Sequence, residues 1–154
     1  MKRKMNSEDR VVILEYSKEE IFMVELLWKK LNAYLSNCSV HFSKEMKQKT
    51  FEQRVTEICT EGTIRVFIAY KGTNKVGYCI SKYNGNIGEI SSLYVDEGVR
   101  KLGIGSELMT NALRWLNSNE VNCINVNVAI GNEGVLEFYK KFNFFDRHIV
   151  LRNK

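Results

Sequence analysis

The N-terminal third of the chain passes from a short apolar run to a stretch with helical spacing. Val11 to Tyr16 is apolar enough to predict a strand. Ser17 and Glu20 follow it with the spacing of a capping box, which predicts that a helix starts there. Apolar residues then recur every three or four positions, which predicts one helix face packed on a core: Ile21, Val24, Trp28, Leu31 and Leu35.

A second helical region is expected after Ser43. Thr50 and Gln53 repeat the capping-box pattern at its later part. The apolar positions that follow fall on one face of the predicted helix: Phe51, Val55 and Ile58. The first third of the chain therefore predicts a strand followed by two helical regions.

Alternation with a period of two begins near residue 63. Thr63 to Tyr70 and Lys75 to Tyr83 each predict a strand. Asn84-Gly85 is a strong signal for a tight hairpin turn, and the segment 87–95 beyond it also has strand character. We therefore expect these neighbouring strands to form an antiparallel sheet.

The last third returns to helical spacing and then alternates again. A helix is predicted over 106–119, a strand over 122–130, a helix from Asn132 and a final strand near 144–151. The helix over 106–119 has an inward face made of Leu108, Met109, Ala112, Leu113 and Leu116. The predicted order is β-α-α-β-β-β-α-β-α-β, a mixed α/β (α+β) sheet with helices.

Length and composition change this picture little. The 154 residues include no proline and no linker-like tract, so we expect a single domain over residues 1–154. No apolar run is long enough to span a membrane, and Lys2, Arg3 and Lys4 precede polar residues rather than a signal-peptide core. A cytoplasmic protein without a membrane partner is the expectation.

The four cysteines suggest neither disulfides nor a metal site. Cys38, Cys59, Cys79 and Cys123 are widely separated and form no C-x-x-C pair, so buried thiols are expected. Cys38 and His41 make one C-x-x-H pair without a second pair nearby. We therefore expect no bound metal.

The strongest chemical signal is a basic, glycine-containing turn between the strand ending at Val95 and the helix over 106–119. The first N–H groups of a helix lack internal partners and the helix dipole favours anions there. Arg-x-x-Gly-x-Gly adds positive charge and close backbone access. The turn predicts a phosphate-binding site made by Arg100, Lys101, Leu102, Gly103, Ile104, Gly105 and Ser106.

Two other phosphate motifs do not fit this turn. A nucleotide P-loop needs Lys and then Ser or Thr after Gly103, where this chain has Ile104 and Gly105. A dinucleotide fingerprint needs a small residue at position 108, which is Leu108. Both nucleotide classes are therefore disfavoured.

The turn closely resembles the acetyl-coenzyme A motif of the GCN5-related N-acetyltransferase (GNAT) superfamily. The segment NEGVLEFYKKFNF, residues 132–144, resembles that superfamily's second motif through Asn132, Tyr139 and Phe144. Val135 replaces a common Ala, and Asn143 replaces the usual Gly after the helix. Asn tolerates the left-handed conformation, so it can still end the helix.

The resemblance implies how acetyl-coenzyme A is held. Two central strands of the superfamily's sheet splay apart and admit the pantetheine arm, which pairs with main-chain groups equivalent to Leu93, Tyr94 and Val95. Asn132 either touches coenzyme A or only caps its helix. Acetyl-coenzyme A is thus the expected cosubstrate.

The resemblance also suggests two catalytic residues. An amine must lose a proton before it attacks, and Glu89 resembles the general base of the histone-acetylating branch, acting through water. The alternative is a strand carboxylate that faces solvent or pairs with a lysine. Tyr139 is the candidate general acid for the departing thiolate, and an aromatic packed in the core is its alternative.

The expected function is direct acetyl transfer to a primary amine of a small molecule or peptide in a ternary complex. By superfamily analogy, the acceptor enters between the first two helices and the sheet, near Tyr34, His41 and Phe42. A catalytically silent acyl-coenzyme A sensor or partner-binding module is the alternative. The net charge of +5 comes without a nucleic-acid-binding pattern, so no nucleic-acid partner is expected. Dimers are common in the superfamily, which leaves a homodimer open.

Overall fold

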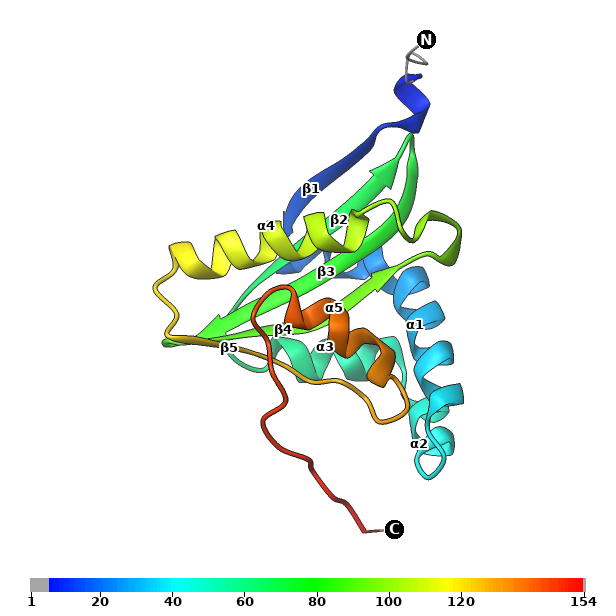
Figure 1. The fold of residues 1–154 in the computed structure, drawn as a ribbon, viewed down its shortest axis with the longest axis vertical. Helices are drawn as coiled ribbons and strands as arrows, with labels where there is room; N and C mark the ends of the chain where they lie inside the picture. The colour runs from blue at the N-terminus through cyan, green and yellow to red at the C-terminus, as the bar shows by residue number, and fades with distance from the viewer. Residues whose placement is uncertain (1–5, 154) are drawn as a thin grey trace.

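A five-stranded mixed sheet forms the centre of the molecule (Figure 1). The computed structural model describes residues 6–153, so the basic residues Lys2 to Lys4 lie outside it. The sheet order is β1-β2-β3-β4-β5; the first four strands pair antiparallel, and β5 pairs parallel to β4. The strands are β1 (Val11–Ser17), β2 (Thr63–Lys71), β3 (Asn74–Asn84), β4 (Ile87–Val95) and β5 (Cys123–Val126). The predicted mixed sheet is confirmed.

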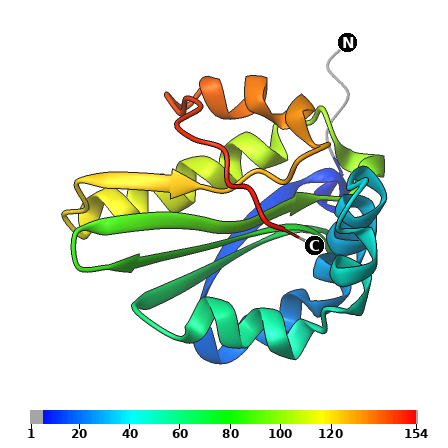
Figure 2. The ribbon, with the colours of Figure 1, turned by 90° about the horizontal axis from the view of Figure 1, so that it is seen from below.

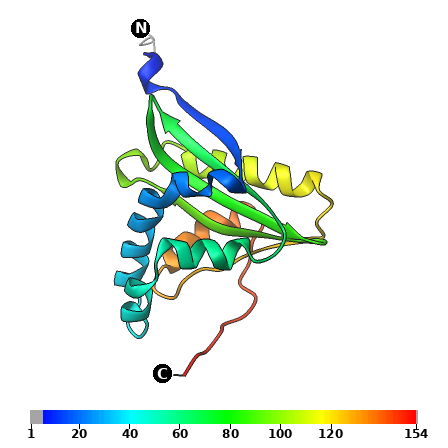
Figure 3. The same ribbon diagram turned by 180° about the vertical axis from the view of Figure 1, so that it is seen from behind.

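Helices cover both faces of this sheet (Figures 2 and 3). One face carries the 3₁₀ turn η2 (Lys18–Val24), α1 (Glu25–Cys38) and α3 (Phe51–Cys59), with α2 (Ser43–Gln48) beside α1. The other face carries α4 (Ile104–Ser118) and α5 (Leu136–Lys140). Short 3₁₀ turns complete the chain: η1 (Ser7–Asp9), η3 (Glu97–Val99) and η4 (Glu133–Val135).

The two faces have separate apolar cores, and helix positions predicted to face a core contribute to each of them. Ile21, Val24 and Trp28 are buried against β2 and β3 on the α1 side. On the α4 side, the predicted inward positions Leu108, Met109, Ala112 and Leu116 are fully buried, whereas Leu113 is half-buried. The sheet is therefore held between two apolar layers.

Local signals were right at the hairpin turn and at the start of α3, whereas Ser17 precedes a helical segment without forming the predicted capping box. β3 ends at Asn84 and β4 begins at Ile87, and Gly85 has a φ of 58°, as the hairpin signal predicts. Thr50 and Gln53 form a complete capping box. Ser17 does not, because its hydroxyl hydrogen-bonds the carboxylates of Glu19 and Glu20 at 2.6 Å. The chain then continues as the 3₁₀ turn η2, and α1 begins only at Glu25.

The predicted last strand over 144–151 is wrong. Asn143 adopts the expected left-handed conformation with a φ of 65°, and the Phe144 N–H donates to the Tyr139 carbonyl. Beyond it the segment 145–153 has no strand assignment, and Ile149, Val150 and Leu151 are at least 77% exposed. A strand needs a neighbour, and β5 offers only Cys123–Val126 rather than the predicted 122–130. The segment is instead held near its end by an ion pair from Arg152 to Glu45 at 3.0 Å.

Two further findings concern the other sequence expectations. Within residues 6–153, none of the helices combines the length and apolar character that a membrane crossing requires. The cysteines are free thiols; Cys79 is buried, Cys38 and Cys59 are half-buried, and Cys123 is exposed. The expectation of uniformly buried thiols is therefore wrong for Cys123, which lies on the short edge strand β5.

Candidate active site

The central feature of the site is the separation of β4 from β5. The two strands pair only from Ile87 with Cys123 to Ile90 with Val126, while β4 continues to Val95. A bulge in β4 marks the point of separation. Ile80 of β3 pairs with Ser92 and Ser81 pairs with Ile90, so Ser91 has no direct partner on β3. Beyond the bulge, the β5 side of β4 therefore has main-chain groups without a neighbouring strand. This is the splay that the resemblance implies.

A cavity of about 230 Å³ occupies the space beside this splay. Its walls come from α1, the α2–α3 region, β4, the segment after β5, and α5. Three of the predicted site residues line it: Leu93, Asn132 and Tyr139. Tyr34, His41 and Phe42 are not among the lining residues; Glu45, Met46 and Lys49 stand in that part of the wall instead.

Tyr139 reaches the cavity from α5 with its hydroxyl unpaired. Its ring packs against Phe138 and Phe144, with centroids 5.3 and 6.1 Å away. Burial raises the pKa of the Tyr139 phenol well above its usual value, and the nearby Cys79 adds to the shift. Among the described residues, no group hydrogen-bonds this hydroxyl. The phenol is therefore protonated at neutral pH, its hydroxyl has no partner among the described residues, and its ring is also part of the core.

Asn132 lines the same cavity but does not cap its helix through its side chain. It precedes η4, and its side chain makes no capping hydrogen bond. Its backbone N–H donates to the Ala129 carbonyl at 3.0 Å, which closes the turn between β5 and η4. Of the two alternatives for Asn132, the cap is thus not observed, and the amide is free to meet a ligand in the cavity.

Gly131 fixes the wall next to Asn132. It has a φ of 90°, and a Cβ at this position would lie 2.2 Å from the Cys38 carbonyl oxygen at the end of α1. Gly131→Ala therefore forces α1 and the 127–132 segment apart. We expect a loss of about 1–3 kcal/mol in the free energy of unfolding, from left-handed strain and the displaced contact. Denaturant unfolding measures it, and Gly98→Ala is the control because a Cβ there meets no atom within 4 Å. Equal stability of both variants would contradict the close approach.

Glu89 lies next to the cavity rather than in its wall. The Ser91 hydroxyl donates to Glu89 Oε1 at 2.8 Å, and Ser91 itself lines the cavity. Lys82 is the direct neighbour of Glu89 on β3, but its ammonium donates to the Ile58 carbonyl at 3.3 Å. The lysine-paired alternative for Glu89 is therefore not observed, and its connection to the cavity passes through Ser91.

The basic turn has the backbone shape expected of an anion site. Lys101 and Gly103 have φ values of 69° and 79°, and α4 begins directly afterwards at Ile104. Going along the chain from Lys101, Glu107 is the first residue whose backbone N–H donates to a protein acceptor, the Gly103 carbonyl at 3.0 Å. In the described part of the chain, the N–H groups from Lys101 to Ser106 have no acceptor. A row of main-chain donors thus meets the positive end of a four-turn helix.

Arg100 joins this turn to the end of β4. Its Nε donates to the Val95 carbonyl at 2.9 Å, and its guanidinium lies 5.7 Å from the centre of the Tyr94 ring. The predicted residues Tyr94 and Val95 therefore link the cavity to the turn, although they do not line the cavity. A Cβ on Gly105 would lie 3.5 Å from Phe138, in ordinary contact, so packing alone does not require glycine there.

Sequence reasoning missed Arg54, which lines the cavity from α3. Its Nη2 donates to the Ser91 carbonyl at 2.6 Å, and its Nη1 donates to Glu57 at 3.2 Å. A signal was available in the sequence: Arg54 shares a helix face with Phe51 and Ile58, where an apolar residue is expected. The role of Ser91 had no such signal, because a bulge is not visible in the residue pattern.

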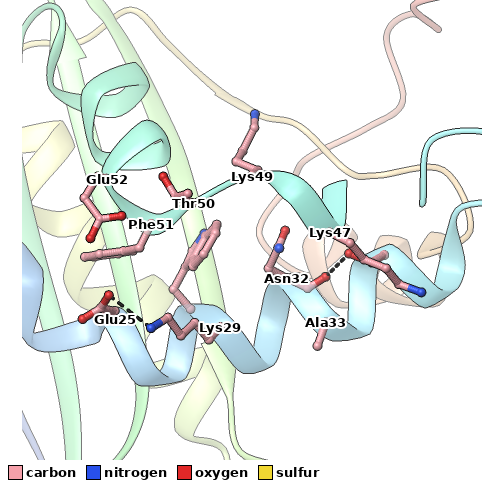
Figure 4. A pocket seen from close by; sticks show the side chains of 11 residues that line it. Glu25, Lys29, Asn32, Ala33, Lys47, Lys49, Thr50, Phe51 and Glu52 are labelled. Atoms are coloured by element: carbon pink, nitrogen blue, oxygen red, sulfur yellow. Dashed lines mark hydrogen bonds and ion pairs between the residues drawn. The ribbon is translucent and has the colours of Figure 1, made fainter. Parts of the chain in front are cut away.

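A second pocket of about 440 Å³ lies between α1 and the segment from α2 to the start of α3 (Figure 4). It is lined by Lys29, Lys47 and Glu52, among others, and shares Trp28, Asn32 and Lys49 with the smaller cavity. None of the predicted site residues lines it. Within residues 6–153, no three His, Cys, Asp or Glu side chains gather closely enough to hold a metal ion.

Known proteins resemble this chain in sequence and in fold. An uncharacterized N-acetyltransferase of Methanocaldococcus jannaschii is 30% identical over 64 residues, which span 42% of this chain and 28% of that protein. A putative acetyl transferase from Pyrococcus furiosus superposes with a TM-score of 0.70 at 22% identity, covering 94% of this chain and 99% of that one. An aminoglycoside N-acetyltransferase, AAC(6')-Iy, crystallised with coenzyme A gives 0.62 at 14% identity, with 94% of each chain covered.

These likenesses agree with the geometry of the splayed strands and the basic turn. The structural neighbours are less than 25% identical to the chain and show the fold. The family model for the acetyltransferase (GNAT) family matches residues 23–144, which include both sequence motifs, the cavity wall and the turn. The chain therefore belongs to the GNAT acetyltransferase family.

Proposed function

We propose that this protein transfers an acetyl group from acetyl-coenzyme A directly to a primary amine, with both substrates bound at once. The observation that carries the proposal is the continuous path along β4. The edge of β4 that β5 leaves unpaired beyond Ile90 runs from the cavity lined by Leu93 and Tyr139 toward the turn whose free N–H groups begin at Lys101. The two halves of this path suit the two ends of one long acyl carrier.

The residues present fit acetyl-coenzyme A. Main-chain N–H groups of the turn, with Lys101 beside them, would hold its phosphates at the start of α4. On the side of β4 that β5 leaves open, main-chain groups of the segment 93–95 would pair with the amide-containing pantetheine arm as an added strand does, although the Val95 carbonyl already accepts from Arg100. Asn132 would contact the arm from the opposite wall of the cavity.

The reaction needs one proton removed and one proton supplied. The amine nitrogen attacks the thioester carbonyl carbon, a C–N bond forms, the C–S bond breaks, and the thiolate leaves. The Tyr139 phenol, which is protonated and unpaired in the cavity, would give its proton to the sulfur. A main-chain N–H of β4 would polarise the carbonyl.

Glu89 remains our candidate base. The amine proton would pass to the Ser91 hydroxyl, or to water beside it, as the hydroxyl proton passes to the carboxylate 2.8 Å away. The relay makes the position of Glu89 outside the cavity wall compatible with its role. Removing a proton from an alkylamine at neutral pH costs about 4 kcal/mol, so a base is needed.

The test combines calorimetry with a thiol-release assay. Acetyl-coenzyme A should bind with measurable heat, and a thiol-reactive dye should report coenzyme A released in the presence of some amine in a mixed panel. Binding without thiol release from any amine or peptide would instead support a silent acyl-coenzyme A sensor. Absence of binding would exclude both functions.

A further inference from the structure

We propose that the amine acceptor carries a carboxylate, and that Arg54 binds this carboxylate beside the reacting nitrogen. The inference rests on the proposed function and names its substrate class. It starts from Arg54, whose side chain is the one guanidinium among the residues that line the 230 Å³ cavity. The acetyl-transfer mechanism proposed above assigns no role to this residue.

Arg54 is held in one place by contacts on both sides. Its Nη2 donates to the Ser91 carbonyl at 2.6 Å, and its Nη1 donates to Glu57 at 3.2 Å. A guanidinium has five N–H donors, and these two contacts leave others for a ligand in the cavity. Because the fork is already oriented, a bound carboxylate would need little reordering of the side chain.

Ser91 places this cation next to the reacting amine. Its carbonyl accepts from Arg54, and its hydroxyl donates to Glu89, the proposed base. An amine that loses its proton through Ser91 therefore lies close to the guanidinium. In an amino acid the amine and the carboxylate are separated by a single carbon, a spacing that suits two groups held by the same residue.

The charged side chains that line the cavity include more cations than carboxylates. The charged lining residues are Lys49, Arg54 and Glu45. Glu45 already pairs with Arg152 at 3.0 Å, and Glu57 is shared by Lys49 at 2.7 Å and Arg54. The hydrogen bond from Lys49, with that from Arg54, holds the pKa of Glu57 below its usual value, so this carboxylate is ionised at neutral pH.

One cation of the Lys49–Arg54–Glu57 group is therefore left without a carboxylate of its own. These cations would repel a second positive group on the acceptor, whereas a carboxylate on the acceptor would give the second cation a partner. This distinguishes the chain from aminoglycoside acetyltransferases that share its fold, because aminoglycosides carry several amines.

The experiment compares free amino acids with their carboxamides in the thiol-release assay, using wild type, Arg54→Gln and Arg54→Lys. An aminoglycoside and a polyamine complete the panel. Arg114→Gln is the matched control, since Arg114 is an exposed arginine on the opposite layer, in α4. Acetyl-coenzyme A affinity by calorimetry reports whether each variant keeps its fold and cosubstrate site.

In wild type and Arg114→Gln, we expect kcat/KM for the best amino acid to exceed that of its carboxamide by roughly ten-fold or more. In Arg54→Gln this preference should fall several-fold, with unchanged acetyl-coenzyme A affinity; Arg54→Lys should retain part of it. Converting the carboxylate to a carboxamide also lowers the pKa of the amine, which affects all the proteins alike. The deciding quantity is therefore the difference between wild type and Arg54→Gln in the ratio of kcat/KM for the amino acid to that for its carboxamide.

Three results would overturn the inference. A wild-type enzyme that acetylates the aminoglycoside or polyamine better than any amino acid would contradict it while leaving acetyl transfer intact. The same preference in Arg54→Gln as in wild type would show that Arg54 does not bind the carboxylate. No thiol release with any amine would refute acetyl transfer itself, and the substrate class with it.

Discussion

Tyr139→Phe is expected to lower kcat about a hundred-fold, the usual contribution of a positioned general acid, while the affinity for acetyl-coenzyme A stays unchanged. The substitution removes only the hydroxyl, which has no partner among the described residues, and keeps the ring contacts with Phe138 and Phe144. The free energy of unfolding should therefore change by less than about 1 kcal/mol. Steady-state kinetics, calorimetry and denaturant unfolding measure the three quantities.

The pH dependence gives a second readout for Tyr139. Its pKa is raised by burial, so the phenol keeps its proton beyond the usual range of a tyrosine. In wild type the rate should rise as the amine loses its proton and show no decline from Tyr139 below about pH 10. Phe142→Tyr serves as a control for a nearby aromatic outside the cavity lining. Unchanged kcat in Tyr139→Phe would contradict the assignment.

Ser106→Glu is expected to weaken acetyl-coenzyme A binding by at least about a hundred-fold without destabilising the fold. Ser106 is the third residue of α4, after the N-cap Gly103. A carboxylate there lies near the phosphates, and a unit charge about 5 Å from another at the effective dielectric of a protein surface costs about 3 kcal/mol. The same carboxylate favours the helix dipole and should add about 0.5 kcal/mol to stability.

Ser106→Glu is expected to weaken acetyl-coenzyme A binding but to raise the free energy of unfolding, so loss of the fold cannot account for the loss of binding. Ser106→Gln has the same shape without the charge and should retain most of the affinity. Calorimetry with acetyl-coenzyme A and thermal unfolding of both variants supply the data. Undiminished affinity in Ser106→Glu would place the phosphates away from α4 and would remove the basis for the proposed site.

The parts of the fold that the sequence predicts are those set by local periodicity. The strands β1 to β4, the inner face of α4 and the turn at Gly85 follow from spacing and from residue types that need no distant partner. The segment 144–151 has strand composition, but its conformation depends on a hydrogen-bonding neighbour that β5 is too short to provide. A helical segment does begin after Ser17, but the capping box does not form because the Glu19 and Glu20 carboxylates accept from the Ser17 hydroxyl.

The candidate site also has one part that local sequence predicts and one part that depends on tertiary packing. The turn from Arg100 to Ser106 is a local motif, and its sequence predicts its backbone shape. The cavity is assembled from α1, α3, β4 and α5, so the meeting of Arg54 with Ser91 depends on tertiary packing that no spacing rule contains. An arginine on an apolar helix face was the one visible hint.

The free donors between Lys101 and Ser106 belong to the main chain, which affects how this loop tolerates change. Leu102 is exposed, so exchanging its side chain for another deletes no donor, provided the left-handed turns at Lys101 and Gly103 survive. A saturation library across the loop should thus show permissive positions directly beside restrictive ones, with backbone conformation and added negative charge deciding which variants still bind an anion.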